Sequence, residues 1–221
     1  WQDYSMWLTV TKTTDTLDGE CSLTDCSLRE AVQAANLTHD TTVIIDLPEA
    51  TYTLSRAGTY DDDNSTGDLD IKAPIKMYGT RTERSIINAN GIDRALELHS
   101  TAGEVWLHNL SIRGGYAPSN WGGGIWVHKL MAELINTEIY DNDAGVGGGL
   151  AVEQEGGYVH LVDSLVSNNN ASMLGGGMSI SGNSGSRANL IIENSSIEYN
   201  TAPEMGGILI AGDANASLRS S

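Results

Sequence analysis

The chain has 221 residues, enough to bury a substantial core in one solenoid or in one to two globular domains. It contains 25 Gly, no Phe and only four Pro, a composition that favours turns and short strands over long helices. Its 12 basic and 29 acidic residues give a net charge of −17, which disfavours nucleic acid, anionic lipid and acidic polysaccharide as partners. We find no run of about 18 apolar residues, so no membrane insertion of this segment is predicted.

The two cysteines, Cys21 and Cys26, lie five residues apart in a loop-like segment. This spacing is typical of a local disulfide in an oxidising compartment. A zinc site is the alternative, but two cysteines cannot complete four ligands without a nearby histidine, and His39 lies beyond the next predicted element. The sequence therefore favours a disulfide.

Residues 27–36 are predicted to form a short helix. Ser27 and Glu30 match the capping-box pattern, and Asn36 can end the helix in a left-handed turn. Its apolar residues recur at helical spacing and give it one apolar face. We expect the disulfide to hold the entry of this helix.

Short alternating strands are predicted next, at 42–47, 51–54, 69–71, 75–78, 85–88 and 96–99. The segment 57–67 between them is rich in acidic residues and is predicted to protrude. Calcium is the cofactor that this region could hold, with oxygen ligands from Asp61, Asp63, Asp68 and Asp70. The EF-hand pattern fails because Thr66 replaces the required glycine, so a solvated loop is the favoured interpretation.

The second half of the chain repeats itself every 25 to 30 residues. The repeat begins with a glycine triplet and an apolar residue, at 122–125, 147–150 and 175–178, and in reduced form at 205–208. Short strands lie between these marks, at 125–128, 133–135, 150–153, 158–162, 178–181, 190–192 and 208–211. Strands this short are stable only when stacked repeats pair them, so the sequence predicts an all-β, right-handed parallel β-helix. Residues 1–40 would form its N-terminal cap and residues 41–221 the β-helix.

An asparagine marks the same position in three successive repeats: Asn142, Asn169 and Asn200. Equivalent asparagines in stacked coils can bond one another and satisfy backbone groups at a bend. In the first copy Gly115 takes this position. The pattern predicts an asparagine ladder.

Segment 26–36, read Cys-Ser-Leu-Arg-Glu-Ala-Val-Gln-Ala-Ala-Asn, closely resembles the signature of bacterial CSLREA-domain proteins. The upstream Cys21 and the segments 66–71, 88–94 and 110–115 are similar to the same family, so the resemblance covers nearly the whole chain. It implies a β-helix on an exported bacterial protein, and the repeats are similar to those of polymorphic outer-membrane proteins and autotransporter passengers. The resemblance implies no single activity.

Alignment of the coils predicts one outward column that contains His99, His128 and Glu153. Trp126 lies beside it, and Trp121 and Tyr116 lie near it. These six residues form the predicted ligand-binding patch, because aromatic rings can stack on a sugar while the polar groups bond its hydroxyls. His128 and Glu153 are the candidate catalytic pair, since stacked His and Glu can exchange protons. Ordinary polar β-helix surface is the favoured interpretation.

Two functions fit the sequence. The first is a non-catalytic extracellular module, a surface scaffold or adhesive domain that binds a glycan or another cell-surface ligand. The second is a polysaccharide lyase or glycoside hydrolase, which would require two carboxylates across a groove, or calcium with a basic residue. We find no catalytic motif and no cluster of basic residues, which favours the first. The sequence ends without an evident cap, so we expect this chain to be part of a larger secreted or surface-attached protein.

Overall fold

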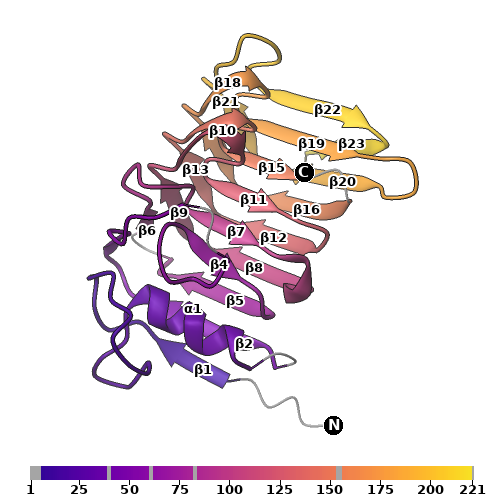
Figure 1. Cartoon of the computed structure of the whole chain (residues 1–221). Helices are drawn as coiled ribbons and strands as arrows, with labels where there is room; N and C mark the ends of the chain where they lie inside the picture. Colours follow the sequence, from indigo (N-terminus) through magenta and orange to yellow (C-terminus); the bar gives the residue numbers. More distant parts are fainter. Residues whose placement is uncertain (1–5, 39–40, 60–61, 82–83, 153–155, 221) are drawn as a thin grey trace, which may run out of the picture.

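The computed structural model describes residues 6–38, 41–59, 62–81, 84–152 and 156–220. They form a parallel β-helix, as predicted, in which short strands stack coil upon coil and one helix lies at the N-terminal end (Figure 1). Every pairing between named strands is parallel, and each strand pairs with its counterparts in the coils before and after it.

Three long sheets and one short sheet make up the walls. Sheet A has eight strands, in order β1 (Met6–Thr9), β2 (Val43–Leu47), β5 (Ile75–Gly79), β8 (Glu104–His108), β12 (Met131–Ile135), β16 (Gly157–Val162), β20 (Ala188–Glu193) and β23 (Ala214–Arg219). Sheet B has six: β3 (Thr51–Thr53), β6 (Ser85–Asn88), β9 (Leu110–Arg113), β13 (Glu138–Tyr140), β17 (Leu165–Ser167) and β21 (Ser196–Glu198). Sheet C has six: β4 (Leu69–Ile71), β7 (Leu96–Leu98), β11 (Ile125–Val127), β15 (Leu150–Val152), β19 (Met178–Gly182) and β22 (Ile208–Gly212). Sheet D has three: β10 (Tyr116–Trp121), β14 (Asp143–Val146) and β18 (Asn170–Leu174).

The core runs through the middle of the coils. Alternate residues of each strand point inward, so that Val43 and Ile45 of β2 stack against Ile75 and Met77 of β5, and all four are fully buried. Burial of a side chain of this size contributes about 1.5–3 kcal/mol, and the same columns continue from coil to coil. The core therefore has the quasi-one-dimensional form expected of a solenoid.

Sharp turns with positive φ separate the sheets, and two of them recur at the residues that the repeat marks. Between sheets A and B the chain turns at a single residue with positive φ, which is Asn109, Asn136, Asp163 or Asn194 in successive coils. Before sheet C the turn is made by the first glycine of each triplet, for example Gly122 at φ 61°. The second glycine has no room for a side chain, since a Cβ on Gly148 would lie 2.3 Å from the Asn170 oxygen. The glycine triplets are thus requirements of the turn.

The predicted asparagine ladder is present. Asn142 Nδ2 donates to Asn169 Oδ1 at 3.0 Å, and Asn169 Nδ2 donates to Asn200 Oδ1 at 3.0 Å. Each Oδ1 also accepts the backbone N–H of the preceding asparagine, at 3.1 and 2.9 Å. The ladder ends at Gly115, whose N–H donates to Asn142 Oδ1 and where a Cβ would clash with the Gly123 oxygen.

The cap is built from helix α1 (Leu28–Asn36), which lies at the indigo end of the stack beside β2 (Figure 1). The predicted capping box is present, with Ser27 as N-cap and Glu30 bonding back to it. Cys21 and Cys26 form the predicted disulfide. The left-handed ending predicted at Asn36 is wrong, because Leu37 closes the helix with φ −79° and the Asn36 side chain instead bonds the backbone of Asp70 and Lys72.

The acidic loop before β4 was predicted to protrude, and for its C-terminal part this prediction is wrong. Its C-terminal part folds onto the cap around Arg29, which is fully buried and pairs with Asp15 at 2.7 Å. The Arg29 guanidinium also donates to four backbone carbonyls of this loop, at Asn64, Thr66, Gly67 and Asp68. A buried guanidinium needs this many acceptors, and the loop supplies them. Strand β1 adds a further link between cap and β-helix, because it pairs with β2 in sheet A.

Candidate functional site

The candidate functional site lies on the outer face of sheet C. In β4, β7 and β11 the leucines, isoleucines and valine point into the core, so the residues between them point outward. The register pairs Asp70 with Glu97 and Glu97 with Trp126. His99 and His128 follow β7 and β11 and form a second outward column, as predicted, with their rings stacked at 5.5 Å and 9°.

Arg94 joins these columns and is 4% exposed. Its Nη1 donates to Glu97 Oε2 at 2.8 Å, and its Nε lies 3.0 Å from Asp68 Oδ2. The guanidinium also lies over the Trp126 ring, 4.5 Å from its centroid. A cation held between two carboxylates and an aromatic face has little freedom to move, so Arg94 is a fixed point of the site.

Each histidine in the column bonds one carboxylate. His99 Nε2 lies 2.8 Å from Asp70 Oδ1, and His128 Nε2 lies 2.8 Å from Glu97 Oε1. Asp70 Oδ2 also accepts the N–H of Asn64 at 3.0 Å, so the loop before β4 helps to orient it. We call the following eight residues the Arg94 cluster: Asp68, Asp70, Asp93, Arg94, Glu97, His99, Trp126 and His128.

The carboxylates of the Arg94 cluster titrate differently. Burial raises the pKa of Asp68 well above its usual value, although Arg94 opposes the rise. Burial also raises the pKa of Asp93, against the hydrogen bond from the Arg94 N–H. Burial would raise the pKa of Glu97 too, but the His128 hydrogen bond and the Arg94 charge outweigh it and lower the pKa. One buried guanidinium therefore cannot neutralise every acid around it.

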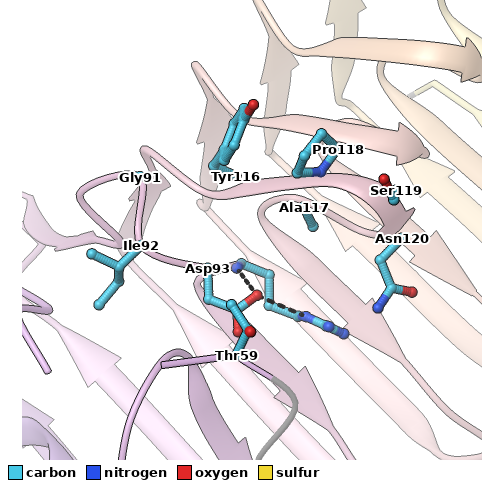
Figure 2. A pocket seen from close by; sticks show the side chains of 10 residues that line it. Thr59, Gly91, Ile92, Asp93, Tyr116, Ala117, Pro118, Ser119 and Asn120 are labelled. Carbon is cyan, nitrogen blue, oxygen red and sulfur yellow. Dashed lines mark hydrogen bonds and ion pairs between the residues drawn. The ribbon is translucent and has the colours of Figure 1, made fainter. Parts of the chain in front are cut away.

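A pocket of about 380 Å³ adjoins the cluster and is lined in part by its residues Asp93 and Arg94. Figure 2 shows Asp93 on one wall and Tyr116, Pro118 and Ser119 of β10 on the facing wall. Ten residues line it: Thr59, Gly91, Ile92, Asp93, Arg94, Tyr116, Ala117, Pro118, Ser119 and Asn120. The pocket thus combines a half-exposed aromatic ring with a carboxyl group, a guanidinium and a side-chain amide.

The predicted ligand-binding patch is divided between these two places. Tyr116 lines the pocket, whereas Trp126, His99 and His128 belong to the adjoining cluster. Trp121 ends β10 and is not among the lining residues. Glu153, the partner proposed for His128 in catalysis, lies outside the described residues.

The predicted calcium ligands are divided as well. Asp68 and Asp70 lie in the Arg94 cluster, where a ligand oxygen from each lies within 4.8 Å of one from Glu97. Asp63 is exposed, and its carboxylate accepts the N–H of Ser65. Asp61 lies outside the described residues.

Sequence reasoning missed Asp93, Arg94 and Asn120 as site residues. A signal for Arg94 existed, because a basic residue stands directly before the alternating strand that carries Glu97 and His99. Nothing in the sequence indicates that Asp93 and Asn120 line one pocket, since Asp93 lies in the connection between β6 and β7 and Asn120 lies on β10, in the next coil.

No family model, no curated protein and no solved structure matches this chain at a significant level. Among the described residues, no helix is both long and apolar enough to cross a membrane. The function must therefore be argued from the site.

Proposed function

We propose that this chain is a non-catalytic extracellular β-helix module that binds a glycan in the pocket between Asp93 and Tyr116. The observation that carries the proposal is the lining of the pocket, which combines an accessible aromatic ring with Arg94, Asp93 and the Asn120 amide. Sugars are recognised in this way, by an apolar face stacked on a ring and by hydroxyls bonded to fixed polar groups.

The negative charge of the chain and of the pocket wall limits the class of glycan that can bind. The net charge of −17 repels polyanions, and Asp93 lies directly in the pocket wall. Arg94 does not reverse this field, because its charge is already shared between Asp68 and Glu97. A neutral or amino-substituted glycan is the ligand class that these charges favour.

The alternative is a glycoside hydrolase, and one observation favours it. Burial raises the pKa of Asp93, as a general acid requires, and Asp93 lines the pocket. Such an enzyme also needs a second carboxylate at the substrate. Among the described lining residues Asp93 is the one carboxylate, while Asp68, Asp70 and Glu97 are buried in the Arg94 cluster. Binding without hydrolysis is therefore the better-supported function.

A glycan array with the purified chain tests the proposal, followed by titration of the best glycan. Tyr116→Ala should weaken binding about 3- to 10-fold, since aromatic stacking is worth about 0.5–1.5 kcal/mol. Tyr199→Ala is the matched control. Tyr199 directly follows β21, is 76% exposed and is not among the residues that line the pocket. Equal loss in both variants, or no glycan bound by the wild type, would contradict the proposal.

A reducing-sugar assay on the same glycans separates binding from hydrolysis. We expect no product from the wild-type chain. Product formed by the wild type and abolished by Asp93→Asn would establish the hydrolase instead.

Export and attachment to a larger bacterial protein complete the proposal. The disulfide supports an oxidising compartment. The resemblance of segment 26–36 to the CSLREA signature supports a surface protein. Arg29 and Glu30 of this segment hold the cap together, which gives a structural reason for these two residues in the signature. Fractionation of the native host, with detection of this segment on the cell surface or in the medium, would test this part.

A further inference from the structure

His99 and His128 have a geometry that the glycan pocket does not use. Their rings stack in register, and both Nε2 atoms face the same carboxylate, at 3.8 Å from Glu97 Oε1 for His99 and 2.8 Å for His128. A ligand atom from each of the three residues lies within 4.8 Å of the other two. The register of sheet C produces this convergence. Glu97 lies on β7, two residues before His99. Trp126 of β11 pairs with Glu97, so His128 lies one coil after His99.

We propose that His99, His128 and Glu97 form a zinc site, with Asp70 as the fourth ligand, since its Oδ1 lies 2.8 Å from His99 Nε2. The donor set of two imidazole nitrogens and carboxylate oxygens is the one that zinc accepts, whereas calcium takes oxygen ligands. This site differs from the calcium site expected from the sequence and shares only Asp70 with it.

Three donor separations lie near those of a tetrahedral ion. Zinc bonds nitrogen and oxygen at about 2.0–2.2 Å, which places neighbouring donors about 3.3 Å apart. The donor pairs here are separated by 2.8, 2.8 and 3.8 Å, for His99 with Asp70, His128 with Glu97 and His99 with Glu97. Shifts of about half an ångström would bring these pairs to the required separation, and rotation of the two imidazole rings out of their stacked arrangement would direct both Nε2 lone pairs at one ion.

The ligands are also oriented from behind. Arg94 Nη1 holds Glu97 Oε2 at 2.8 Å, which leaves Oε1 toward the histidines. The Asn64 N–H holds Asp70 Oδ2 at 3.0 Å, which leaves Oδ1 toward His99. Such partners are typical of metal ligands, because they fix which oxygen faces the ion. The histidine side chains are 17% and 20% exposed, so an ion can enter from solvent.

Charge favours a cation at this place. Asp68, Asp93 and Glu97 each lie within 3.9 Å of the Arg94 guanidinium, and an Asp70 oxygen lies within 4.8 Å of oxygens of Asp68 and Glu97. A divalent ion would offset part of this excess of negative charge, which burial makes unfavourable. The zinc site is independent of the proposed glycan pocket, since none of its four ligands lines that pocket.

Isothermal titration of the chelator-treated chain with Zn²⁺ is the test. We expect one equivalent to bind, with at least about tenfold weaker binding in His128→Gln and in His99→Gln. His160→Gln is the matched control, because His160 is also an outward histidine between two carboxylates, 3.7 Å from Glu133 and 3.5 Å from Glu193. The folding of each variant is checked by circular dichroism.

A second measurement needs no variant. In a ¹⁵N-histidine-labelled wild-type chain, Zn²⁺ should shift the imidazole nitrogens of His99 and His128 but not those of His160. Absence of saturable binding, larger shifts at His160, loss of binding in His160→Gln alone, or tighter binding of Ca²⁺ than of Zn²⁺ would each overturn the proposal.

Discussion

The N-terminal part of the chain, up to β7, and the glycine-rich coils after it belong to one β-helix but are held together in two different ways. In the coils built from β11 to β22, one turn of each coil makes the same neutral contact, an asparagine amide bonded to the next amide in the stack. Toward the cap the turns are irregular and charged groups replace the amides, with Arg29 buried among loop carbonyls and Arg94 buried among carboxylates.

The ladder contact and the buried guanidinium differ in whether they can be repeated along the stack. A ladder contact satisfies its backbone groups with identical neighbours, so it can be extended by one more coil at little cost. A buried guanidinium has one set of partners and cannot be repeated, because each copy would carry a new desolvation cost. The buried ion pairs of Arg29 and Arg94 therefore lie in the N-terminal cap and in the site on the outer face of sheet C.

Removal of the cap guanidinium should have the largest effect. Arg29→Met leaves Asp15 buried without its ion pair and removes the donor to the Gly67 and Asp68 carbonyls. Breaking a buried pair from one side costs about 3–5 kcal/mol. Arg219→Met is the control, because Arg219 pairs with Glu193 at the exposed end and such pairs are worth about 0–1 kcal/mol. Urea unfolding measures both, and similar losses would show that the cap is not held by charge.

Removal of one ladder amide should cost less. Asn169→Ala takes the acceptor from the Asn142 N–H and Nδ2 and the donor from the Ile139 carbonyl, all of them buried. Unsatisfied groups of this kind cost about 1–3 kcal/mol, and we expect a value in the upper half of that range.

The control for the ladder is the neighbouring residue. Asn168 is exposed and has φ 54°, so Asn168→Gly keeps the left-handed turn and should cost only a few tenths of a kcal/mol. Thermal or urea unfolding compares the two variants. Equal destabilisation would mean that the stack does not depend on the amide contacts.

Reduction of the disulfide should be smaller again. The bridge from Cys21 to Cys26 closes a loop of about six residues, which the chain-entropy model values at about 2 kcal/mol. The loss should appear first in the helix, because the bridge ends directly before the N-cap Ser27. Hydrogen exchange of α1 with and without reductant measures this, and thiol titration of unreduced, unfolded protein should find no free sulfhydryl. Earlier exchange in the coils than in α1 would contradict the assignment of the bridge to the cap.

The regular coils could be predicted from sequence because their signals repeat. Glycine triplets and asparagines recur at fixed places, and each copy confirms the others. In sheet B, β3 and β6 were predicted, but β9, β13, β17 and β21 were missed, since each has only three or four residues and follows a sheet A strand after a turn at one left-handed residue such as Asn136. Strand β1 was missed because its only partner, β2, lies beyond the helix in sequence.

The candidate site could be predicted only in part. Alternation along β7 and β11 predicted that His99 and His128 share an outward column, and their stacked rings confirm it. The place of Arg94 depends on Asp68 and Trp126, which lie one coil away on either side. Contacts between irregular coils have no repeated pattern, so no periodicity reveals them.

The smallest effect on stability is expected at Asp68, and its sign depends on pH. Because burial raises the pKa of this carboxyl in the folded chain, the folded state holds its proton more tightly than the unfolded state does. The contribution of Asp68 is therefore most favourable below its ordinary pKa of 3.8 and falls as the pH rises toward the folded-state value. Asp68→Asn, which cannot ionise, removes this fall but also loses the ion pair with Arg94.

These two effects oppose each other at neutral pH, so Asp68→Asn should change stability there by less than about 1 kcal/mol, far less than Arg29→Met. As the pH rises from 4 to 7, the variant should gain stability relative to the wild type. Urea unfolding of both proteins across this range measures the gain. A relative loss with rising pH would mean that Asp68 is held ionised by Arg94, and then Arg94 would stabilise its coils through charge just as Arg29 stabilises the cap.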